Sequence, residues 1–580
     1  MESKKKYFLT ELSIVLLFIV LAYIYIAIPL HKGIIYVGSD RMFHIERLEE
    51  AYQTLKSGHI VSLISTYSSS RVGQAINTFY PWINLIPYSI IRLFVVKPVS
   101  AYYLFMMAEQ FLGLIVAYFC VLKLVKNRKA SILFSMLYRF STYMLINDFA
   151  RADIGEAWAT IFLPMCFVGS YMIFTSNAKR KYVEGALLLA LGLIFITYCH
   201  ILTTVMVIGI LSLIYIVTFY FQTNKLEKFI YFSISAGIYL LGSLIIIFPL
   251  IDTMGKVKIM IPNAEYFENY NLTFNTVFNK SLENKLDANA PHIGIVILVV
   301  MILGLFFFKK SNLCQKIVYI LGVGILFMST SLFPWTGFVN TPISVIQFPW
   351  RMLTISILCV SFYFVSQYDI QQLNKFIFVV IGAIIMVGVV SSEMNFILSQ
   401  KNNIYASNEI DYADPWGKLL GNVGYMHVLS KDYDYLPSAA YKDYLPEQSR
   451  EIEDEVFHHY VYINGKKQIV PNRDIKSCYQ GLEYHIILQS RNNKIVLPFL
   501  IYNKNNYDVY INGLKLNTIV TQNSRLVVNY EQSGNVTIKV KYRIPLSYTI
   551  MSILSVITIC GAISLYYVQY FGVKKYSKEI

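Results

Sequence analysis

The chain has 580 residues, of which 56% are hydrophobic and 15% are charged, and its mean hydropathy is +0.49. These values exclude an ordinary soluble globular protein and are typical of a polytopic membrane protein. The net charge of +15 does not indicate nucleic-acid binding, because residues 392–545 hold 17 basic and 16 acidic residues and the excess therefore belongs to the membrane part.

The first predicted element is an apolar helix at about residues 7–30. It follows the basic start "MESKKK", its apolar run is longer than the core of a signal peptide, and no small-residue cleavage site follows. We therefore expect an uncleaved membrane helix. The seven cysteines are scattered without disulfide-type or metal-type spacing, so neither kind of framework is predicted.

The orientation of the later apolar runs follows from the basic clusters between them. These clusters stand at residues 4–6, 123–129, 179–181, 225–228, 309–316, 375 and 574–578. If all are cytoplasmic, an even number of crossings separates each neighbouring pair. Twelve spans with both termini in the cytoplasm satisfy this condition, at about residues 7–30, 100–124, 131–147, 157–176, 182–199, 201–221, 229–251, 291–308, 317–333, 351–369, 375–391 and 546–571.

One apolar stretch, "FYPWINLIPYSIIRLF" at residues 79–94, is left out of this count. It is about 16 residues long and contains two prolines, so we expect a helix at the membrane interface and not a full crossing. The loop over residues 31–99 then lies outside the cell. Its first part, "VGSDRMFHIERLEEAYQTLKSG", is predicted to be an amphipathic helix that rests on the membrane through Met42, Ile45, Leu48 and Leu55.

The chain changes character over residues 392–545. "YADPWGKLLGNVG" and "DYDYLPSAAYKDYLPEQ" are irregular, whereas "YVYINGKKQIV", "YDVYINGLKLNTIV", "SRLVVNY" and "NVTIKVKYRIP" alternate around Asn-Gly and Ser-Gly turns. We predict three parts: an α-helical membrane domain over 1–391, a small extracytoplasmic β-rich domain over 392–545, and a final helix with a basic cytoplasmic tail over 546–580.

Four groups of polar residues fall at the predicted outer ends of helices. They are Asp40, Arg41, His44 and Arg47, with Arg71 and Tyr80 later in the same loop; Asp148, Arg151, Asp153 and Glu156; His200; and Gln347 with Arg351. Charges at a lipid boundary are costly unless they pair or face water, so such a gathering indicates a functional site.

Several stretches resemble, in order, a bacterial integral membrane family named after a supposed relation to 6-pyruvoyl-tetrahydropterin synthase. They are "GSDRMFHIERL", "TFYPWINLIPY", "RADIGEAWATIFLPM", "YCHILTT", "SVIQFPWRML" and the later "YLP" repeats. That family in turn resembles the GT-C glycosyltransferases. The resemblance implies an enzyme at the outer membrane face that transfers a sugar, with inversion, from a polyprenyl-phosphate carrier to an envelope acceptor.

The resemblance also implies roles for individual residues. In GT-C enzymes an acidic residue early in the first outer loop lies at the reaction centre, and Asp40 matches that position. A carboxylate there accepts the proton that an acceptor hydroxyl loses as it attacks the anomeric carbon. The leaving lipid phosphate needs cations with planar, paired donors, for which Arg351 is the first candidate, followed by Arg151 and Arg71.

The remaining site residues carry less specific assignments. Asp153 and Glu156 either bind a divalent ion such as Mg²⁺ or Mn²⁺ together with Asp40, as in some GT-C enzymes, or pair with Arg151, and their spacing does not decide between the two. His44, Gln347 and His200 complete the predicted substrate-binding set.

Each assignment has a structural alternative. Asp40 is also placed to cap the following helix or to pair with Arg41 or with lysines of the same loop. The Arg151, Asp153 and Glu156 group equally suits a structural ion-pair cluster. His44 and His200 suit satisfied interfacial histidines, because each stands alone in the sequence, and Arg351 suits a side chain that snorkels to the headgroups.

Two polar features inside or beside helices are interpreted as structural. Asp148 is expected to be a loop residue. Glu109 and Arg139 fall within predicted helices, where neither can face lipid cheaply, so we expect them to pair across the helix interface.

Two other functions stay open. A transporter or flippase of lipid-linked saccharides would have internal repeats, broken helices and charges near the bilayer midplane. A catalytically inactive protein that assembles envelope machinery through its β-rich domain is the other. In each case the expected location is a bacterial plasma membrane, and the expected partners are membrane lipids, a lipid-linked sugar and an envelope glycan.

Overall fold

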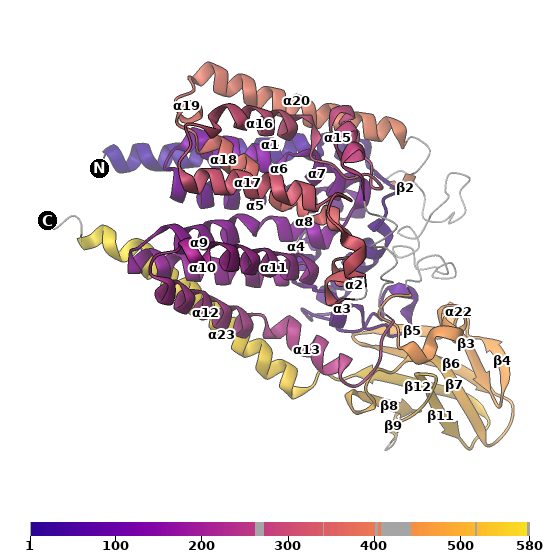
Figure 1. The fold of residues 1–580 in the computed structure, drawn as a ribbon. Helices are drawn as coiled ribbons and strands as arrows, with labels where there is room; N and C mark the ends of the chain where they lie inside the picture. Colours follow the sequence, from indigo (N-terminus) through magenta and orange to yellow (C-terminus); the bar gives the residue numbers. More distant parts are fainter. Residues whose placement is uncertain are drawn as a thin grey trace.

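The computed structural model describes residues 2–260, 272–339, 341–400, 404–407, 442–516 and 519–576. Its helices form an elongated bundle with a β-sandwich at one end, and the start of α1 and the end of α23 lie at the opposite end (Figure 1). The irregular stretch predicted at 412–424, and the part of "DYDYLPSAAYKDYLPEQ" before residue 442, lie outside the described residues.

The bundle consists of two groups of helices that lie beside each other (Figure 1). The first group is α1 (Glu2–Lys32), α5 (Pro98–Val125), α6 (Arg128–Arg139), α16 (Gly294–Phe308), α17 (Leu313–Met328), α18 (Leu353–Val365) and α20 (Lys375–Ser399). The second group is α9 (Leu163–Thr175), α10 (Lys179–Thr197), α11 (Ile201–Thr218), α12 (Lys225–Gly242), α13 (Leu244–Met254) and α23 (Leu546–Tyr576). Short helices α7 (Thr142–Leu145), η3 (Ile146–Arg151), α8 (Ile154–Thr160) and α15 (Phe274–Glu283) connect the two groups, and α19 (Tyr368–Gln371) lies between α18 and α20.

The helical character predicted for the membrane part is confirmed. Among the described residues, six helical segments are long and apolar enough to cross a membrane, and the bent pair α12–α13 makes a seventh if it is one span. Each of the twelve predicted spans contains a helix, but α16 and α17 have only 15 and 16 residues. The exact count of twelve therefore stays a prediction.

The predicted span over 229–251 is not straight, because α12 and α13 meet at a bend of 69°. The bend frees backbone groups that the membrane interior cannot solvate. Ser555 of α23 satisfies two of them: its hydroxyl donates to the carbonyl of Leu241 at 3.1 Å and accepts from the amide of Ile245 at 2.9 Å. The bend directs α13 toward the sandwich.

The predicted span over 131–147 is also divided. Helix α6 ends at Arg139, and the chain continues through α7 into η3, a short π-helix that ends at Ala152 in the left-handed conformation with a φ of 59°. Asp148 lies in this π-helix and not in a loop as expected. It is buried and accepts hydrogen bonds from Tyr25 at 2.5 Å and Gln110 at 2.6 Å.

The helix predicted to rest on the membrane surface, α2 (Arg41–Lys56), is instead buried. Ile45 and Leu48 lie in the main hydrophobic core, and the charged residues Glu46, Arg47 and Glu50 are buried as well. The prediction was wrong because its apolar stripe packs against other elements of the first loop, including the amphipathic α4 (Ile86–Phe94). The apolar helical segment Ile83–Phe94 is short, as expected of a segment that does not cross the membrane.

The predicted β-rich region is confirmed as two five-stranded sheets, with strand orders β10-β11-β7-β3-β4 and β5-β6-β12-β8-β9. The strands are β3 (Tyr460–Ile463), β4 (Lys466–Ile469), β5 (Ile475–Cys478), β6 (Gly481–Leu488), β7 (Asn493–Leu500), β8 (Tyr507–Ile511), β9 (Leu514–Lys515), β10 (Val520–Gln522), β11 (Arg525–Tyr530) and β12 (Gly534–Tyr542). The Asn464-Gly465 and Asn512-Gly513 turns close hairpins with positive φ at both residues, as type I′ turns require.

The sandwich packs against the first loop of the membrane part. Leu63 and Val72 share a hydrophobic cluster with sandwich residues such as Phe499. A short sheet connects the start of this loop to the chain that follows α20, since β1 (Ile34–Tyr36) pairs with β2 (Ile404–Ser407). The loop is therefore held between the helices and the sandwich.

One buried ion pair joins two helices of the bundle. Arg139 of α6 and Glu109 of α5 form an ion pair of 2.8 Å, which confirms the predicted contact. Its formation removes two charges from contact with lipid.

Candidate active site

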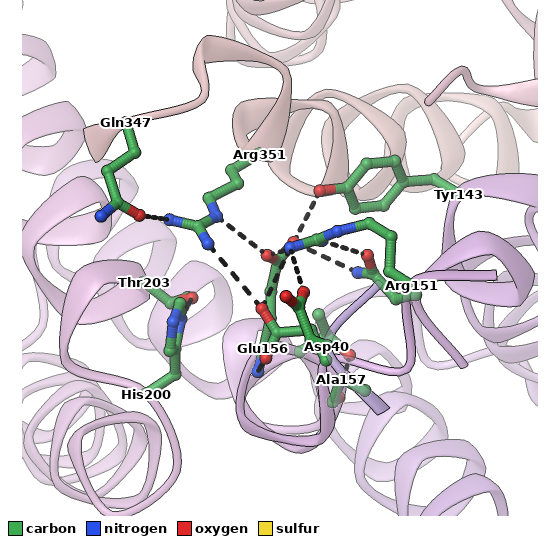
Figure 2. A network of polar contacts seen from close by, with 12 residues as sticks. Asp40, Tyr143, Arg151, Glu156, Ala157, His200, Thr203, Gln347 and Arg351 are labelled. Atoms are coloured by element: carbon green, nitrogen blue, oxygen red, sulfur yellow. Dashed lines mark hydrogen bonds and ion pairs between the residues drawn. The ribbon is translucent and has the colours of Figure 1, made fainter. Parts of the chain in front are cut away.

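The polar groups that the sequence separates converge at the end of the bundle next to the sandwich. Asp40 precedes α2, Arg151 ends η3, Asp153 and Glu156 begin α8, His200 precedes α11, and Gln347 and Arg351 precede α18. Figure 2 shows Arg151 and Arg351 directed at Glu156 from two sides, with Asp40 and His200 nearby. The resulting cluster brings together three carboxylates, two guanidinium groups and two imidazoles.

Glu156 is the most enclosed carboxylate of the cluster, with no exposed surface. Its Oε1 accepts from Tyr143 at 2.6 Å and from Asn147 at 3.1 Å. Its Oε2 accepts from Arg151 at 2.9 Å and lies 3.2 Å from Nε of Arg351. Both oxygens are therefore occupied by protein donors, as a buried charge requires.

Asp153 caps the N-terminus of α8, with Oδ1 accepting from the Glu156 amide at 3.1 Å. The same oxygen lies 3.2 Å from the Tyr80 hydroxyl and 3.3 Å from Nε2 of His44, while Oδ2 accepts from Arg151 at 3.0 Å. Burial alone would raise the pKa of Asp153, but the His44 hydrogen bond and the nearby positive charges hold it well below the usual range.

Asp40 differs from the other two carboxylates because 44% of its side chain is exposed. It stands at the N-cap position of α2, yet its side chain makes no capping hydrogen bond, so the capping alternative does not hold. Its amide donates to the Arg151 carbonyl at 2.8 Å, which holds it beside η3. Its Oδ2 lies 3.7 Å from Nη2 of Arg151.

The electrostatics of Asp40 combine opposing effects. Partial desolvation raises its pKa above the ordinary aspartate value, the positive charge of Arg151 opposes that rise, and the negative charge of Asp153 adds to it. Arg41 does not pair with Asp40, because its Nη2 donates to the Phe149 carbonyl at 2.6 Å. The carboxylate therefore lies beside a guanidinium group while 44% of its side chain stays open to solvent.

The two arginines are held by aromatic rings as well as by carboxylates. The guanidinium of Arg151 lies 4.5 Å from the centroid of Trp350, and that of Arg351 lies 5.0 Å from Phe348. Nη1 of Arg351 donates to Gln347 at 3.2 Å, and Gln347 itself has a positive φ of 61°. Nη2 of Arg351 makes no hydrogen bond within the part of the chain that is described, and its nearest carboxylate oxygen, on Asp153, is 3.8 Å away.

The two histidines lie on either side of one tyrosine, and each has a polar partner, which agrees with the alternative of satisfied histidines and leaves a substrate-binding role a prediction. Tyr80 lies between them, with ring centroids 5.6 Å from His44 and 5.8 Å from His200. His200 also contacts Thr203 through Nδ1 at 2.8 Å. Burial lowers the pKa of His200 to about 4, so this imidazole is neutral at pH 7.

Arg71 is the predicted site residue that contacts a different part of the molecule. It is buried and donates from Nη1 to the carbonyl of Ile475 in β5 at 3.0 Å. Its contacts tie the first loop to the sandwich. Its assignment to phosphate binding stays a prediction.

Sequence reasoning missed one contribution to the cluster, which comes from the segment that enters the sandwich. The Tyr444 ring stacks on Phe79 with centroids 5.7 Å apart, next to Tyr80. The backbone carbonyl of Asp443 accepts from Gln74 at 2.7 Å, and the Asp40 charge helps to raise the pKa of Asp443, after the larger effect of burial. The only signal in the sequence was the "YLP" repeat, which does not indicate a partner.

The carboxylates do not fit a divalent metal ion. Among the described residues, no group of three His, Cys, Asp or Glu side chains is arranged to hold one. Asp153 and Glu156 already accept hydrogen bonds from Arg151, which a cation would have to displace. Of the two alternatives left open by spacing, the arrangement corresponds to pairing with Arg151.

Comparison with known proteins gives a family but no curated relative. The profile of a family described as "6-pyruvoyl-tetrahydropterin synthase related domain; membrane protein" matches residues 78–397. No curated protein matches the chain significantly.

Two solved structures of the arabinofuranosyltransferase AftD from Mycobacteria are similar to part of the chain. One has 15% identity and a TM-score of 0.40 over 65% of this chain and 26% of AftD. The other, of a mutant form, has 14% identity and a TM-score of 0.40 over 65% of this chain and 27% of its own. The chain thus spans about a quarter of the length of these proteins.

Proposed function

The chain belongs to the family of membrane proteins described as 6-pyruvoyl-tetrahydropterin synthase related, and from this premise we propose that it is a GT-C-type glycosyltransferase. It transfers a sugar from a polyprenyl-phosphate carrier to a hydroxyl of an envelope glycan, at the outer face of a bacterial plasma membrane. The site is the cluster formed around Asp40, Arg151, Asp153, Glu156 and Arg351.

The observation that carries this proposal is the contrast between Asp40 and its neighbours. Glu156 and Asp153 are buried and fully engaged by donors, whereas Asp40 is 44% exposed and lies 3.7 Å from the nearest guanidinium. A structural ion pair does not require a carboxylate held open to solvent beside two arginines. A general base does require it, because the acceptor hydroxyl has to come within hydrogen-bond distance.

In the proposed reaction, an acceptor hydroxyl donates its hydrogen bond to Asp40 and attacks the anomeric carbon opposite the phosphate. The new carbon–oxygen bond forms as the bond to the phosphate oxygen breaks, which inverts the configuration. The hydroxyl proton passes to Asp40 and then to water. The bonding electron pair leaves with polyprenyl phosphate.

Arg351 is proposed to hold the leaving phosphate. Its Nη2 is free of hydrogen bonds within the described part of the chain, while Nε and Nη1 are fixed by Glu156 and Gln347. Such anchoring leaves one edge of a rigid, permanently charged group for the phosphate oxygens. Arg151, fixed against Trp350, adds positive charge at the same place.

A lipid-linked donor also needs an apolar surface. A cavity of about 630 Å³ lies between α9, α11, α17 and α18, and its lining is mainly apolar, including Val207, Ile325 and Ile355. Ile325 and Ile355 also belong to or pack against the hydrophobic cluster that contains Met206 and Met352. We propose that the hydrocarbon chain of the donor occupies this cavity.

The test uses the full-length protein in lipid nanodiscs with a panel of polyprenyl-phosphate sugars and cell-wall glycans. Released polyprenyl phosphate and glycosylated acceptor are quantified by mass spectrometry. Asp40→Asn should lower kcat by about 100-fold or more, because it removes the proton acceptor. Asp369→Asn, an exposed aspartate of α19 at the far end of the bundle, is the matched control and should leave kcat unchanged.

The outcomes separate the three functions. Wild-type kcat in Asp40→Asn, with an unchanged melting temperature, would refute the base assignment. An absence of transfer from every donor, together with movement of a fluorescent lipid-linked saccharide across liposomes, would identify a transporter. Absence of both activities would identify an inactive assembly protein.

A further inference from the structure

A second cavity, of about 520 Å³, lies where the chain beyond α13 meets the sandwich. One wall is Lys256, Val257 and Lys258, directly after the end of α13 at Met254. The opposite wall comes from the sandwich and includes Lys504, Thr521 and Ser524. The cavity is therefore built by the membrane part and the sandwich together.

The charge of this cavity is positive. Of its three lysines, Lys256 is paired with Asp252 at 2.7 Å, whereas Lys258 and Lys504 have no ion-pair partner among the described residues. Glu447 is the one carboxylate among the described lining residues, and it has Arg450 as a partner at 3.8 Å. Within the part of the chain that is described, two ammonium groups thus lack a carboxylate partner, and they lie beside the hydroxyls of Thr521 and Ser524, the second of which donates to Gln448 at 3.3 Å.

A short antiparallel pairing connects this cavity to the candidate active site. The Glu447 amide donates to the Lys258 carbonyl at 2.9 Å, and the Tyr444 amide donates to the Met260 carbonyl at 3.0 Å. Tyr444 stacks on Phe79 beside the cluster, while Glu447, three residues later, lines the cavity. Three residues of chain span at most about 10 Å, so the two ends of this segment are no farther apart than that.

Tyr502 forms a second connection. It lines the cavity, and its hydroxyl donates to the Tyr444 carbonyl at 2.8 Å. A molecule bound in the cavity therefore lies next to Tyr502, which holds the Tyr444 backbone beside the cluster.

We propose that this cavity binds a phosphate ester, with the ammonium groups of Lys258 and Lys504 and the hydroxyls of Thr521 and Ser524 as the recognising groups. Lysine binds phosphate as a point charge, and hydroxyls complete the hydrogen bonds to its oxygens. The size of the cavity admits a phosphate together with part of the unit that carries it.

Two sources supply such a group: a phosphate-bearing envelope glycan and a membrane lipid headgroup. Lipid is close, because Ile251 of α13 and Leu546 of α23 are exposed apolar residues near this end of the bundle. The connection to the candidate site favours the glycan, which would reach the cluster as the acceptor. Only this assignment to the acceptor rests on the proposed function; the binding of phosphate does not.

The experiment measures binding in the absence of a sugar donor. Full-length protein in nanodiscs of phosphatidylcholine is titrated with a soluble, fluorescently labelled oligomer of glycerol phosphate, and anisotropy is recorded at two salt concentrations. The double variant Lys258→Ala/Lys504→Ala should weaken binding about tenfold or more, and added salt should weaken wild-type binding. The double variant Lys466→Ala/Lys494→Ala removes two exposed lysines elsewhere on the sandwich and is the matched control.

A second arm repeats the titration with phosphatidylglycerol vesicles. Oligomer binding that depends on Lys258 and Lys504, and persists in Asp40→Asn, supports the proposal whether or not sugar transfer is detected. Binding of the vesicles alone, with the same lysine dependence, assigns the phosphate to a lipid and overturns the acceptor assignment. Equal affinity in both double variants, or no binding to either probe, overturns the site.

Discussion

At the residue scale, the three carboxylates of the cluster have different surroundings and therefore different expected roles. Glu156 accepts from three side chains and forms an ion pair with a fourth, and Asp153 accepts from a backbone amide and contacts three side chains, so each neutralises and orients its neighbours. Asp40 has one ion-pair contact, at 3.7 Å. Substitution of the buried groups should therefore act on folding, and substitution of Asp40 on chemistry.

Glu156→Gln should destabilise the protein. The change leaves the buried guanidinium groups of Arg151 and Arg351 without the carboxylate that both contact, and breaking a buried charge network costs about 3–5 kcal/mol. The apparent melting temperature in detergent should fall by several degrees. Glu227→Gln, at an exposed position in the first turn of α12, should leave it unchanged. A stable Glu156→Gln variant would mean that the network is not structural.

The buried glutamates of α2 make a separate prediction about pH. Burial raises the pKa of Glu46 to about 8, against an ordinary value of 4.5, although its Oε2 accepts from the Ser69 amide at 2.8 Å. The folded state therefore holds a proton that the unfolded state releases. This contribution to stability is complete below about pH 4.5 and is lost as the pH rises through 8.

Glu46→Gln should remove part of this pH dependence. The wild-type melting temperature should fall between pH 5 and pH 9, with Glu46 contributing roughly 3 kcal/mol to the loss, and the variant should be the more stable protein at the alkaline end. Glu531→Gln, an exposed control in the sandwich, should follow the wild-type curve. Superimposable curves for wild type and Glu46→Gln would contradict the burial of a neutral carboxyl.

Among the elements, the first turn of α8 depends on the close approach of the Tyr80 side chain to Gly155. A Cβ added to Gly155 would lie 2.2 Å from the Tyr80 hydroxyl and 2.8 Å from its ring. The Tyr80 hydroxyl in turn lies 3.2 Å from Oδ1 of Asp153, and the guanidinium of Arg47 lies 4.2 Å from the centroid of the Tyr80 ring. Glycine at this position therefore allows the first loop to reach the α8 N-terminus.

Gly155→Ala should force Tyr80 away from Asp153 and cost about 1–3 kcal/mol, as overpacking in a filled core does. The same change should cost less in a Tyr80→Ala background, and this coupling is the readout in a double-mutant cycle of melting temperatures. Gly388→Ala, where an added Cβ meets open space on α20, is the control and should be near neutral. Equal costs in both backgrounds would show that Tyr80 does not occupy this position.

The elements themselves were largely predictable from the sequence, because apolar runs, basic loops and Asn-Gly turns act locally. The exceptions depend on contacts with distant parts of the chain, which local hydropathy does not register. Ser555 stabilises the bend between α12 and α13 from a distant helix, and the apolar residues of α2 alternate with charges that find buried partners. An amphipathic pattern predicts which face of a helix is covered, but not whether lipid or protein covers it.

At the scale of the whole molecule, the site is assembled from segments that are far apart in the chain. The polar groups were identifiable because each ends a helix, and helix ends at one side of a bundle meet. The contact of Tyr444 with Phe79 was not, because it depends on how the sandwich docks onto the first loop. The arrangement of Arg351 against Glu156 likewise depends on the packing between the two groups of helices.

The loop charges and the packing of the bundle together predict which end of the molecule faces the cytoplasm. Arg128, in the first turn of α6, pairs with Glu11 near the start of α1 at 2.7 Å, so the α5–α6 turn and the N-terminus share one end of the bundle. The sandwich lies at the other end (Figure 1). If the basic turns are cytoplasmic, the segment over 79–94 does not cross the membrane and the sandwich is outside.

Single cysteines test this orientation in intact cells. Lys129→Cys and Lys466→Cys occupy exposed positions at the two ends, in a background from which Cys314, Cys478 and Cys560 have been removed. A membrane-impermeant maleimide should label the cysteine at 466 directly and the one at 129 only after permeabilisation, because the bilayer separates the second from the reagent. Labelling at 129 alone would reverse the orientation of the site. Labelling at both positions in intact cells would place the α5–α6 turn and the sandwich on the same side of the membrane. Since Glu11 and Arg128 hold that turn beside the start of α1, at the end of the bundle away from the sandwich (Figure 1), this second outcome would contradict a bundle that crosses the membrane between its two ends, as well as the loop charges.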